Sequence, residues 1–263
     1  MREIKKMLEE NENNVAESQI DIENQPPYAS HPGFKDWVYR LILFVTGFLA
    51  LDIITFIIQL ILNAIVPDFF KEGSPNYVTG LAMMNSIRYV LLIIAFLILL
   101  YPRLKILLRK FLNWKEDLIG LGIGVAIILI TICYNLVISQ FIDPGTNNNE
   151  IYAEEMIKGF PLLSIIVLGL LGPICEEITY RYGLFSLLDK KSKILAYILT
   201  PLVFAIIHFD FMGDMKVELL NLPVYILAGL SLSFAYDRFG FNAAIIAHVT
   251  NNIYAITMTL LGL

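Results

Sequence analysis

Long apolar runs alternate with short polar segments along most of the chain. A helix needs about 20 apolar residues to cross the hydrocarbon core of a bilayer. Seven runs reach or approach this length: Val38–Val66, Val78–Tyr101, Leu118–Ile142, Pro161–Leu188, Ile194–Phe209, Leu219–Tyr236 and Phe241–Leu261. Prolines within the fifth and sixth runs are tolerated inside a helix bundle, where neighbours satisfy the freed backbone groups. The pattern predicts an all-α, polytopic transmembrane helix bundle of about seven spans.

Composition excludes the soluble classes. Of the 263 residues, 57% are hydrophobic and only 16% are charged, and the mean hydropathy is +0.68. A soluble domain has roughly 45–50% apolar and about 25% charged residues. A net charge of −5 also gives no global basic field for nucleic acid. We therefore expect membrane lipids as partners and no nucleic acid.

The acidity is concentrated before the first span. Residues 1–36 hold eight acidic and four basic side chains, with little apolar mass. Such a segment cannot form a core, and it lacks the basic and apolar regions of a signal peptide. We expect a disordered acidic cytoplasmic tail at 1–36, N-terminal transmembrane helices at 37–142 and a functional membrane core at 161–263.

Lysine and arginine are distributed unevenly between the two sets of loops. Nine lie on one side: Arg103, Lys105, Arg109, Lys110, Lys115, Lys190, Lys191, Lys193 and Arg238. Three lie on the other: Lys71, Lys158 and Lys216. Cytoplasmic loops carry the excess of positive charge. This predicts a multi-pass protein of the plasma membrane with a cytoplasmic N-terminus. The basic segment Pro102–Trp114 is either an interfacial amphipathic helix or an extension of a neighbouring span.

Ionisable residues inside the spans indicate function, because they are costly at bilayer depth. Asp52 and Arg88 lie at similar depths in the first two spans. They predict a buried ion pair, with substrate binding as the alternative.

The fourth span carries Glu176, Glu177 and Arg181. Glu177 and Arg181 are four residues apart, so they share a helix face and can neutralise each other. Glu176 points elsewhere and could act as a general base or a metal ligand. The alternative is one structural network of all three. The adjacent Cys175 is interpreted as a packing residue, like Cys133.

Two histidines lie in later spans. His208 ends the pattern Phe204-x-x-x-His208, at about the depth of Glu176 in an antiparallel hairpin. His248 and Asn252 are four residues apart in the last span, where both could donate hydrogen bonds to an oxyanion. A polar contact between helices is the alternative for this pair.

Two chemistries fit this set. A water held by Glu176 and His208 could attack an amide carbonyl, with His248 and Asn252 stabilising the oxyanion. Alternatively, Glu176, His208 and His248 could bind a divalent metal such as zinc, leaving one position open for water. Both routes hydrolyse a peptide bond without a Ser or Cys nucleophile, and no cofactor is certain.

The ordered motifs Glu-Glu-x-x-x-Arg, Phe-x-x-x-His and His-x-x-x-Asn over residues 161–263 resemble the CPBP family of intramembrane proteases, which includes CAAX prenyl endopeptidases and Abi bacteriocin-immunity proteins. The resemblance implies that Glu176 and His208 activate water and that His248 and Asn252 stabilise the oxyanion. It gives supporting roles to Glu177, Arg181 and Phe204. The family was labelled metalloprotease, although its CAAX-processing branch favours a metal-independent glutamate site.

The resemblance implies an intramembrane endopeptidase acting on a peptide or membrane-protein substrate near the cytoplasmic side. Peptide maturation and bacteriocin self-immunity are the roles it suggests, since the composition resembles that of bacterial members. Two alternatives come from other classes: a non-enzymatic immunity or peptide-binding membrane protein, and a small transporter with Asp52 and Arg88 in its path.

Overall fold

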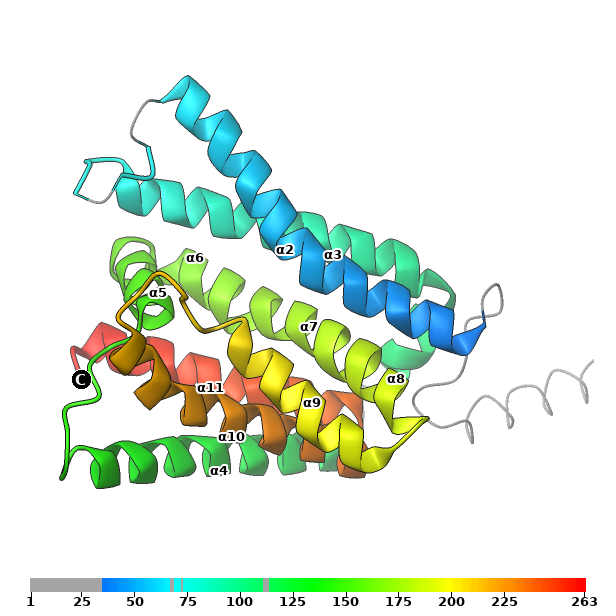
Figure 1. The fold of residues 1–263 in the computed structure, drawn as a ribbon. Helices are drawn as coiled ribbons and strands as arrows, with labels where there is room; N and C mark the ends of the chain where they lie inside the picture. Colours follow the sequence, from blue (N-terminus) through cyan, green and yellow to red (C-terminus); the bar gives the residue numbers. More distant parts are fainter. Residues whose placement is uncertain (1–34, 67–68, 72, 111–113) are drawn as a thin grey trace, which may run out of the picture.

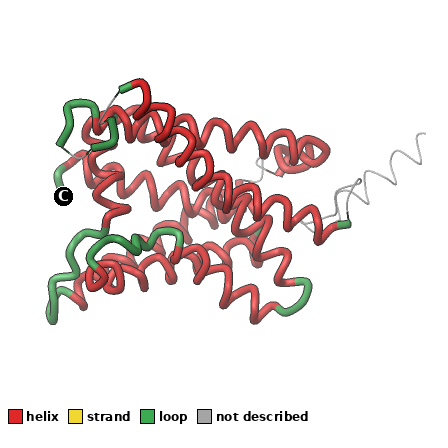
Figure 2. The backbone as a smooth tube through the Cα atoms, turned by 45° about the horizontal axis from the view of Figure 1, so that its top comes forward, coloured by secondary structure: helices red, strands yellow, loops and turns green. Residues whose placement is uncertain are grey.

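The computed structural model describes residues 35–66, 69–71, 73–110 and 114–263 (Figure 1). Within these residues the regular structure is helical and there is no β-strand (Figure 2). The predicted acidic tail lies outside the described residues, except for its last two positions. The all-α fold class is confirmed.

The described helical segments follow one another along the bundle. In chain order they are α2 (Asp36–Ile65), α3 (Tyr77–Lys110), α4 (Trp114–Ile138), α5 (Asn148–Gly159), α6 (Pro161–Ile166), η1 (Val167–Leu171), α7 (Gly172–Glu176), η2 (Glu177–Phe185), α8 (Ser186–Asp189), α9 (Lys193–Ile206), α10 (Met215–Phe239) and α11 (Phe241–Leu261). The segments from α6 to α8 form one continuous rod, in which η1 and η2 are π-helical.

Six of the described helices are long and apolar enough to cross a membrane, and α9 is a shorter apolar helix. This agrees with about seven spans, the fifth of them short. The third span begins earlier than predicted, at Trp114, because Glu116 and Asp117 form a polar first turn, where acidic side chains favour the helix dipole. Residues 102–110 of the segment Pro102–Trp114 continue α3, whereas 111–113 lie outside the described residues and Trp114 begins α4.

Helix α5 was not predicted, because its 12 residues are too few for a membrane-length apolar run. It is short and amphipathic, and the Asn147 side chain caps it by accepting a hydrogen bond from the Glu150 backbone N–H at 2.9 Å. An Asn followed three residues later by Glu resembles the capping-box signature of a helix start. That signal was present in the sequence.

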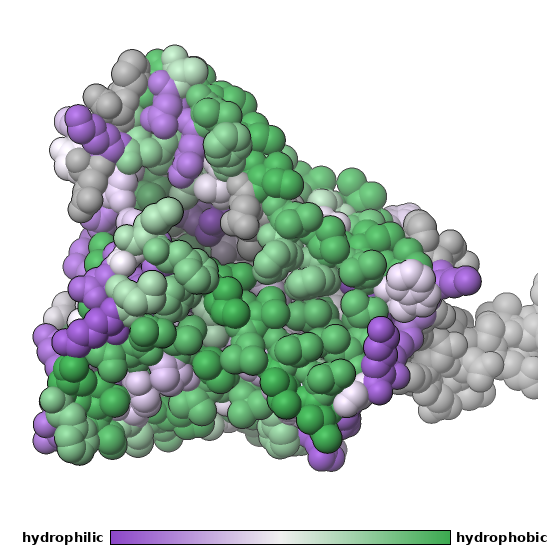
Figure 3. Space-filling model, viewed as in Figure 1, coloured by the Kyte–Doolittle hydropathy of each residue, from purple (hydrophilic) through white to green (hydrophobic). Residues whose placement is uncertain are grey.

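The bundle has two distinct ends. At the basic end, the start of α2 meets the turn after α8 through the Asp36–Lys190 ion pair, and Lys193 pairs with Asp237 of α10 at 2.8 Å. At the far end, the Asn148 amide donates to Asp210 at 2.6 Å. Figure 3 shows hydrophobic side chains over the flank between the two ends and hydrophilic ones gathered near the ends. This distribution suits a chain that crosses a bilayer.

Candidate active site

The rod from α6 to α8 places the acidic motif inside the protein. Glu176 ends α7, and Glu177 begins the π-helical η2, whose backbone N–H at Ser186 reaches the Arg181 carbonyl five residues earlier. π-helical turns are rare and occur frequently at functional sites. Glu177 and Arg181 are fully buried, and Glu176 is 8% exposed.

Glu177 and Arg181 form the pair that their spacing predicts. Arg181 Nη1 donates to Glu177 Oε1 at 2.8 Å, and its Nη2 donates to the Gly229 carbonyl of α10 at 3.1 Å. The guanidinium also lies over the Phe204 ring, 4.6 Å from its centroid. A buried charge needs such compensation, since removing one partner leaves the other uncompensated. These contacts hold η2, α9 and α10 together.

His248 of α11 lies between the two glutamates. Its Nδ1 is 2.8 Å from Glu177 Oε1, and its Nε2 is 3.7 Å from Glu176 Oε2. With the Nδ1 proton donated to Glu177, Nε2 is directed toward Glu176. The sequence predicted His248 beside Asn252, but it did not indicate that Glu177 holds the imidazole. This relay from Arg181 through Glu177 to His248 orients the ring.

Tyr89 of α3 is a site residue that the sequence analysis missed. Its hydroxyl donates to Glu176 Oε1 at 3.3 Å, and the side chain is 5% exposed. The two residues are 87 positions apart, and no local pattern marks this tyrosine. It connects the first half of the chain to the predicted general base.

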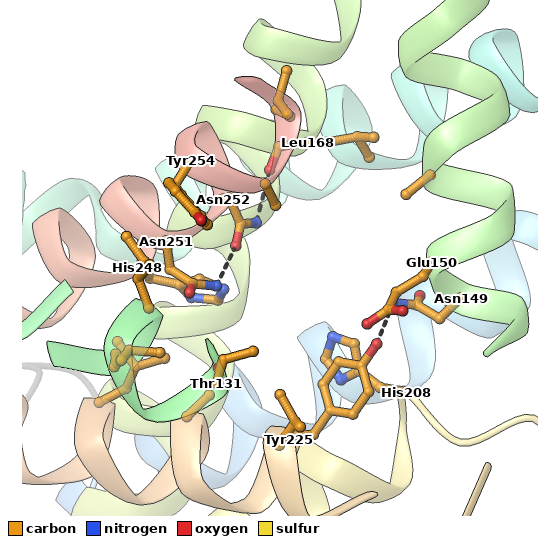
Figure 4. A pocket seen from close by; sticks show the side chains of 18 of the residues that line it. Thr131, Asn149, Glu150, Leu168, His208, Tyr225, His248, Asn251, Asn252 and Tyr254 are labelled. Atoms are coloured by element: carbon orange, nitrogen blue, oxygen red, sulfur yellow. Dashed lines mark hydrogen bonds between the residues drawn. The ribbon is translucent and has the colours of Figure 1, made fainter. Parts of the chain in front are cut away.

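Asn252 and His208 lie on different walls of one cavity. Asn252 Nδ2 donates to the Leu168 carbonyl at 3.0 Å, which leaves its second N–H available. His208 follows the end of α9, where its Nδ1 lies 2.8 Å from the Phe204 carbonyl and its ring stacks on Tyr225 at 4.6 Å between centroids. Figure 4 shows His248 and Asn252 on one side of a cavity, with His208 and Tyr225 across from them.

All four predicted catalytic residues line this cavity, whose volume is about 270 Å³. Phe204 is part of the same lining, together with Asn149 and Glu150 of α5. Among the described residues, no direct hydrogen bond links His208 to Glu176. The cavity that both residues line is large enough for a water molecule and a carbonyl group.

A second cavity of about 290 Å³ shares Glu176, His208 and Asn252 with the first. Its other walls include Phe48 of α2 and Arg88 of α3. In Figure 3 a hollow with a hydrophilic floor separates α2 and α3 from the helices below them. The predicted ion pair between Asp52 and Arg88 involves the Asp52 side chain, which lies outside the described residues.

The predicted zinc ligands are not arranged as a ready metal site. Among the described residues, no three His, Cys, Asp or Glu side chains lie close enough together to hold an ion. His248 already uses Nδ1 toward Glu177.

The two cysteines differ in their environments. Cys175 is fully buried in the core, as its interpretation as a packing residue predicts. Cys133 was expected to pack in the same way, but it is exposed on α4. This prediction was wrong because only a narrow stripe of α4 faces the protein, so most of its apolar residues face outward.

Comparisons with known proteins find similarity in the part of the chain that carries the three motifs. Residues 158–254 match the family model described as type II CAAX prenyl endopeptidase Rce1-like. The chain is 27% identical over 211 residues to "Putative membrane peptidase YdiL" of Bacillus subtilis, which covers 74% of this chain and 82% of that protein. It is 26% identical over 168 residues to an uncharacterized protein of Mycoplasma capricolum, covering 59% of this chain.

The match spans about half (48%) of the length of the Mycoplasma relative. No solved structure matches the chain. The family match includes Glu176, His208, His248 and Asn252 and ends before the last turns of α11. The segment 158–254 is therefore similar to the Rce1-like group of type II CAAX prenyl endopeptidases.

Proposed function

We propose that this chain is a multi-pass intramembrane endopeptidase that hydrolyses a peptide bond with water activated by Glu176 and His208. The observation that carries the proposal is the shared cavity, which Glu176, His208, His248 and Asn252 all line. The family match and the similarity to a membrane peptidase support it. The N-terminus lies on the cytoplasmic side in this proposal, and the membrane is the plasma membrane.

In the proposed reaction, a water between Glu176 and His208 gives one proton to the Glu176 carboxylate while its oxygen attacks the carbonyl carbon. The carbonyl oxygen becomes an oxyanion, which accepts hydrogen bonds from the free N–H of Asn252 and from the Nε2–H of His248 in its imidazolium form, the form that can donate to Glu177 and to the oxyanion at once. The carbon–nitrogen bond then breaks, and Glu176 returns its proton to the leaving amine. Glu177 and Arg181 act indirectly, since they orient His248.

Cleavage assays on a peptide library test this proposal. Glu176→Gln keeps the size of the side chain but cannot accept a proton in the same way. General acid–base catalysis is worth about 10²–10⁴-fold, so we expect a loss of this order in the cleavage rate. Asp189→Asn, on α8 at the basic end, is the matched carboxylate control and should cleave at the wild-type rate.

Chelator added to the same assay tests the metal route, because a Glu/His site without metal retains its rate. Full cleavage by purified Glu176→Gln would reject the enzymatic proposal. If that variant also kept protecting cells from a bacteriocin, it would favour the non-enzymatic immunity function. Peptide maturation and self-immunity are the roles we propose for the enzyme.

A further inference from the structure

Both cavities lie in the half of the bundle nearer the far end. Helix α4 runs from the basic end, and it contacts the first cavity only from Ile127 onward. Helix α9 runs in the same direction, and it contributes Phe204 near its last turn. The short helix α5 lies at the far end and supplies Asn149, which lines both cavities.

The other half of the bundle is closed by packed aromatic rings. Phe185 lies 5.2 Å from Tyr197 and 5.8 Å from Tyr236 between ring centroids, and Tyr182 lies 5.5 Å from Phe241. Phe185 and Tyr236 are at most 2% exposed. Close packing of this kind leaves no passage for a peptide. The active-site space is therefore closed toward the basic end.

The loop charges orient these two ends. The basic end carries the turn after α8, the start of α4 and the turn before α11, with Lys115, Lys191 and Arg238 among its nine loop cations. The far end carries three. An excess of lysine and arginine marks the cytoplasmic loops. The far end is then the face away from the cytoplasm.

The far end is also acidic. Residues 139–160 and 207–218, which connect the helices there, contain seven acidic and two basic side chains. Glu150 of α5 lies on the cavity wall itself. A cleft lined by one sign of charge raises the local concentration of oppositely charged ligands.

We propose that the site is entered from the extracytoplasmic end of the bundle, and that its substrate is a lysine- or arginine-rich peptide segment presented at that face. The inference rests on the proposed endopeptidase function and names its substrate class. It differs from the cytoplasmic-side cleavage that the family resemblance implies. The geometry behind it is the pair of cavities in the half nearer the acidic end, which packed aromatic rings close off from the basic end.

Cysteine labelling in intact cells tests the direction of entry without using activity. In a full-length background lacking Cys133 and Cys175, Asn149→Cys places a thiol on the exposed cavity rim, and Lys191→Cys is the matched control at the basic end. A membrane-impermeant maleimide should label Asn149→Cys in intact cells and Lys191→Cys only after permeabilisation. The reverse pattern, or equal labelling of both, would overturn the proposal.

Peptide charge is tested with the purified full-length protein. A lysine-containing substrate should be cleaved with a kcat/KM about tenfold or more above that of its glutamine analogue at low salt. Salt should reduce the difference, because mobile ions screen exposed charges. Combined Glu150→Gln, Glu154→Gln and Glu155→Gln substitutions should reduce it as well.

Equal cleavage of both peptides at low salt would overturn the substrate class. Absence of any cleavage that depends on Glu176 would instead overturn the proposed function. The labelling result would still decide which face the cavity meets, so the two failures are distinguishable.

Discussion

Helix α4 and the rod from α6 to α8 differ in how deeply they are buried and in where they carry charged residues. In its most apolar window, α4 has 17% of its residues buried, and it has no charged residue after Asp117. The same measure for the rod is 56%, although the rod carries Glu176, Glu177 and Arg181. Lipid is as apolar as leucine, so apolar surface gains little by leaving it.

The comparison shows that charge, more than hydrophobicity, decides which helix is central here. Glu177 and Arg181 are fully enclosed by protein, where η2, α10 and α11 supply their partners. Helix α4 instead docks on α11 through small residues that let the backbones approach. Helix α4 and the rod should therefore be destabilised by different kinds of substitution.

The largest effect is expected from breaking the buried pair in the rod. Glu177→Ala or Arg181→Ala leaves an uncompensated buried charge, which costs about 3–5 kcal/mol of stability. Phe56→Ala on α2 is the control, because this side chain is 61% exposed and should change stability by less than about 0.5 kcal/mol. Unfolding of the purified protein in lipid–detergent micelles measures the difference.

Replacing both charged partners sharpens the test. Glu177→Leu combined with Arg181→Met should recover part of the loss, since well-packed apolar residues can replace an ion pair. Recovery should remain incomplete, because His248 still loses its hydrogen bond to Glu177. Equal stability of the single variants and the Phe56→Ala control would show that charge does not decide which helix is central.

A smaller effect is expected where α4 meets α11. A Cβ atom at Gly124 would lie 2.6 Å from Thr250 Cβ and 2.7 Å from the Ala247 carbonyl oxygen. We expect Gly124→Val to cost about 1–3 kcal/mol, as overpacking does elsewhere. Gly122→Val, two residues away on the same helix with no atom within 4 Å, is the matched control. If the two valine variants melted alike, the small-residue contact would not hold α4 in place.

Features within one helix could be predicted from the sequence, whereas contacts between helices could not. Apolar length alone indicates the spans, because a bilayer requires it. The Glu177–Arg181 contact also follows from spacing within one helix. Contacts between helices depend on how each helix is rotated and shifted, and hydropathy does not determine that. The His248–Glu177 hydrogen bond and the Tyr89 contact belong to this second kind.

Depth arithmetic placed Glu176 and His208 in one region, and both do line one cavity. It did not predict that His248 would lie nearer to Glu176 through a 3.7 Å contact. The π-helical turns of η2 contribute to this error. The depth of Glu176 was calculated with the rise of an ordinary α-helix, whereas a π-helix has more residues per turn. Local periodicity therefore predicted which residues line one cavity better than it predicted their hydrogen-bond partners.

Tyr89 tests whether the first half contributes to the site beyond anchoring it. Tyr89→Phe removes one hydrogen bond to Glu176, worth about 0.5–1.5 kcal/mol, so kcat should fall about two- to tenfold. The KM should stay unchanged, because Tyr89 is expected to position Glu176. Tyr134→Phe removes a similar hydroxyl, which donates to the Leu220 carbonyl away from Glu176. A kcat equally low in both variants would indicate general loosening of the bundle.

The smallest effect is expected at the far end of the bundle, where Asn148 of α5 meets Asp210 of the loop after α9. The Asn148 amide hydrogen bond, with a second from the Met212 backbone, holds the pKa of Asp210 below its usual range. A carboxyl whose pKa is lowered by folding contributes stability above its unfolded value, near 3.9, and loses it as the pH falls further. Partly exposed interactions are worth at most about 1 kcal/mol. Asp210→Asn should therefore lower the melting temperature slightly at pH 7, and the gap to wild type should shrink as the pH falls below about 3.9. A gap that did not shrink at all with falling pH would mean that Asp210 acts through packing, so that α5 and the loop after α9 would be joined by shape and not by charge.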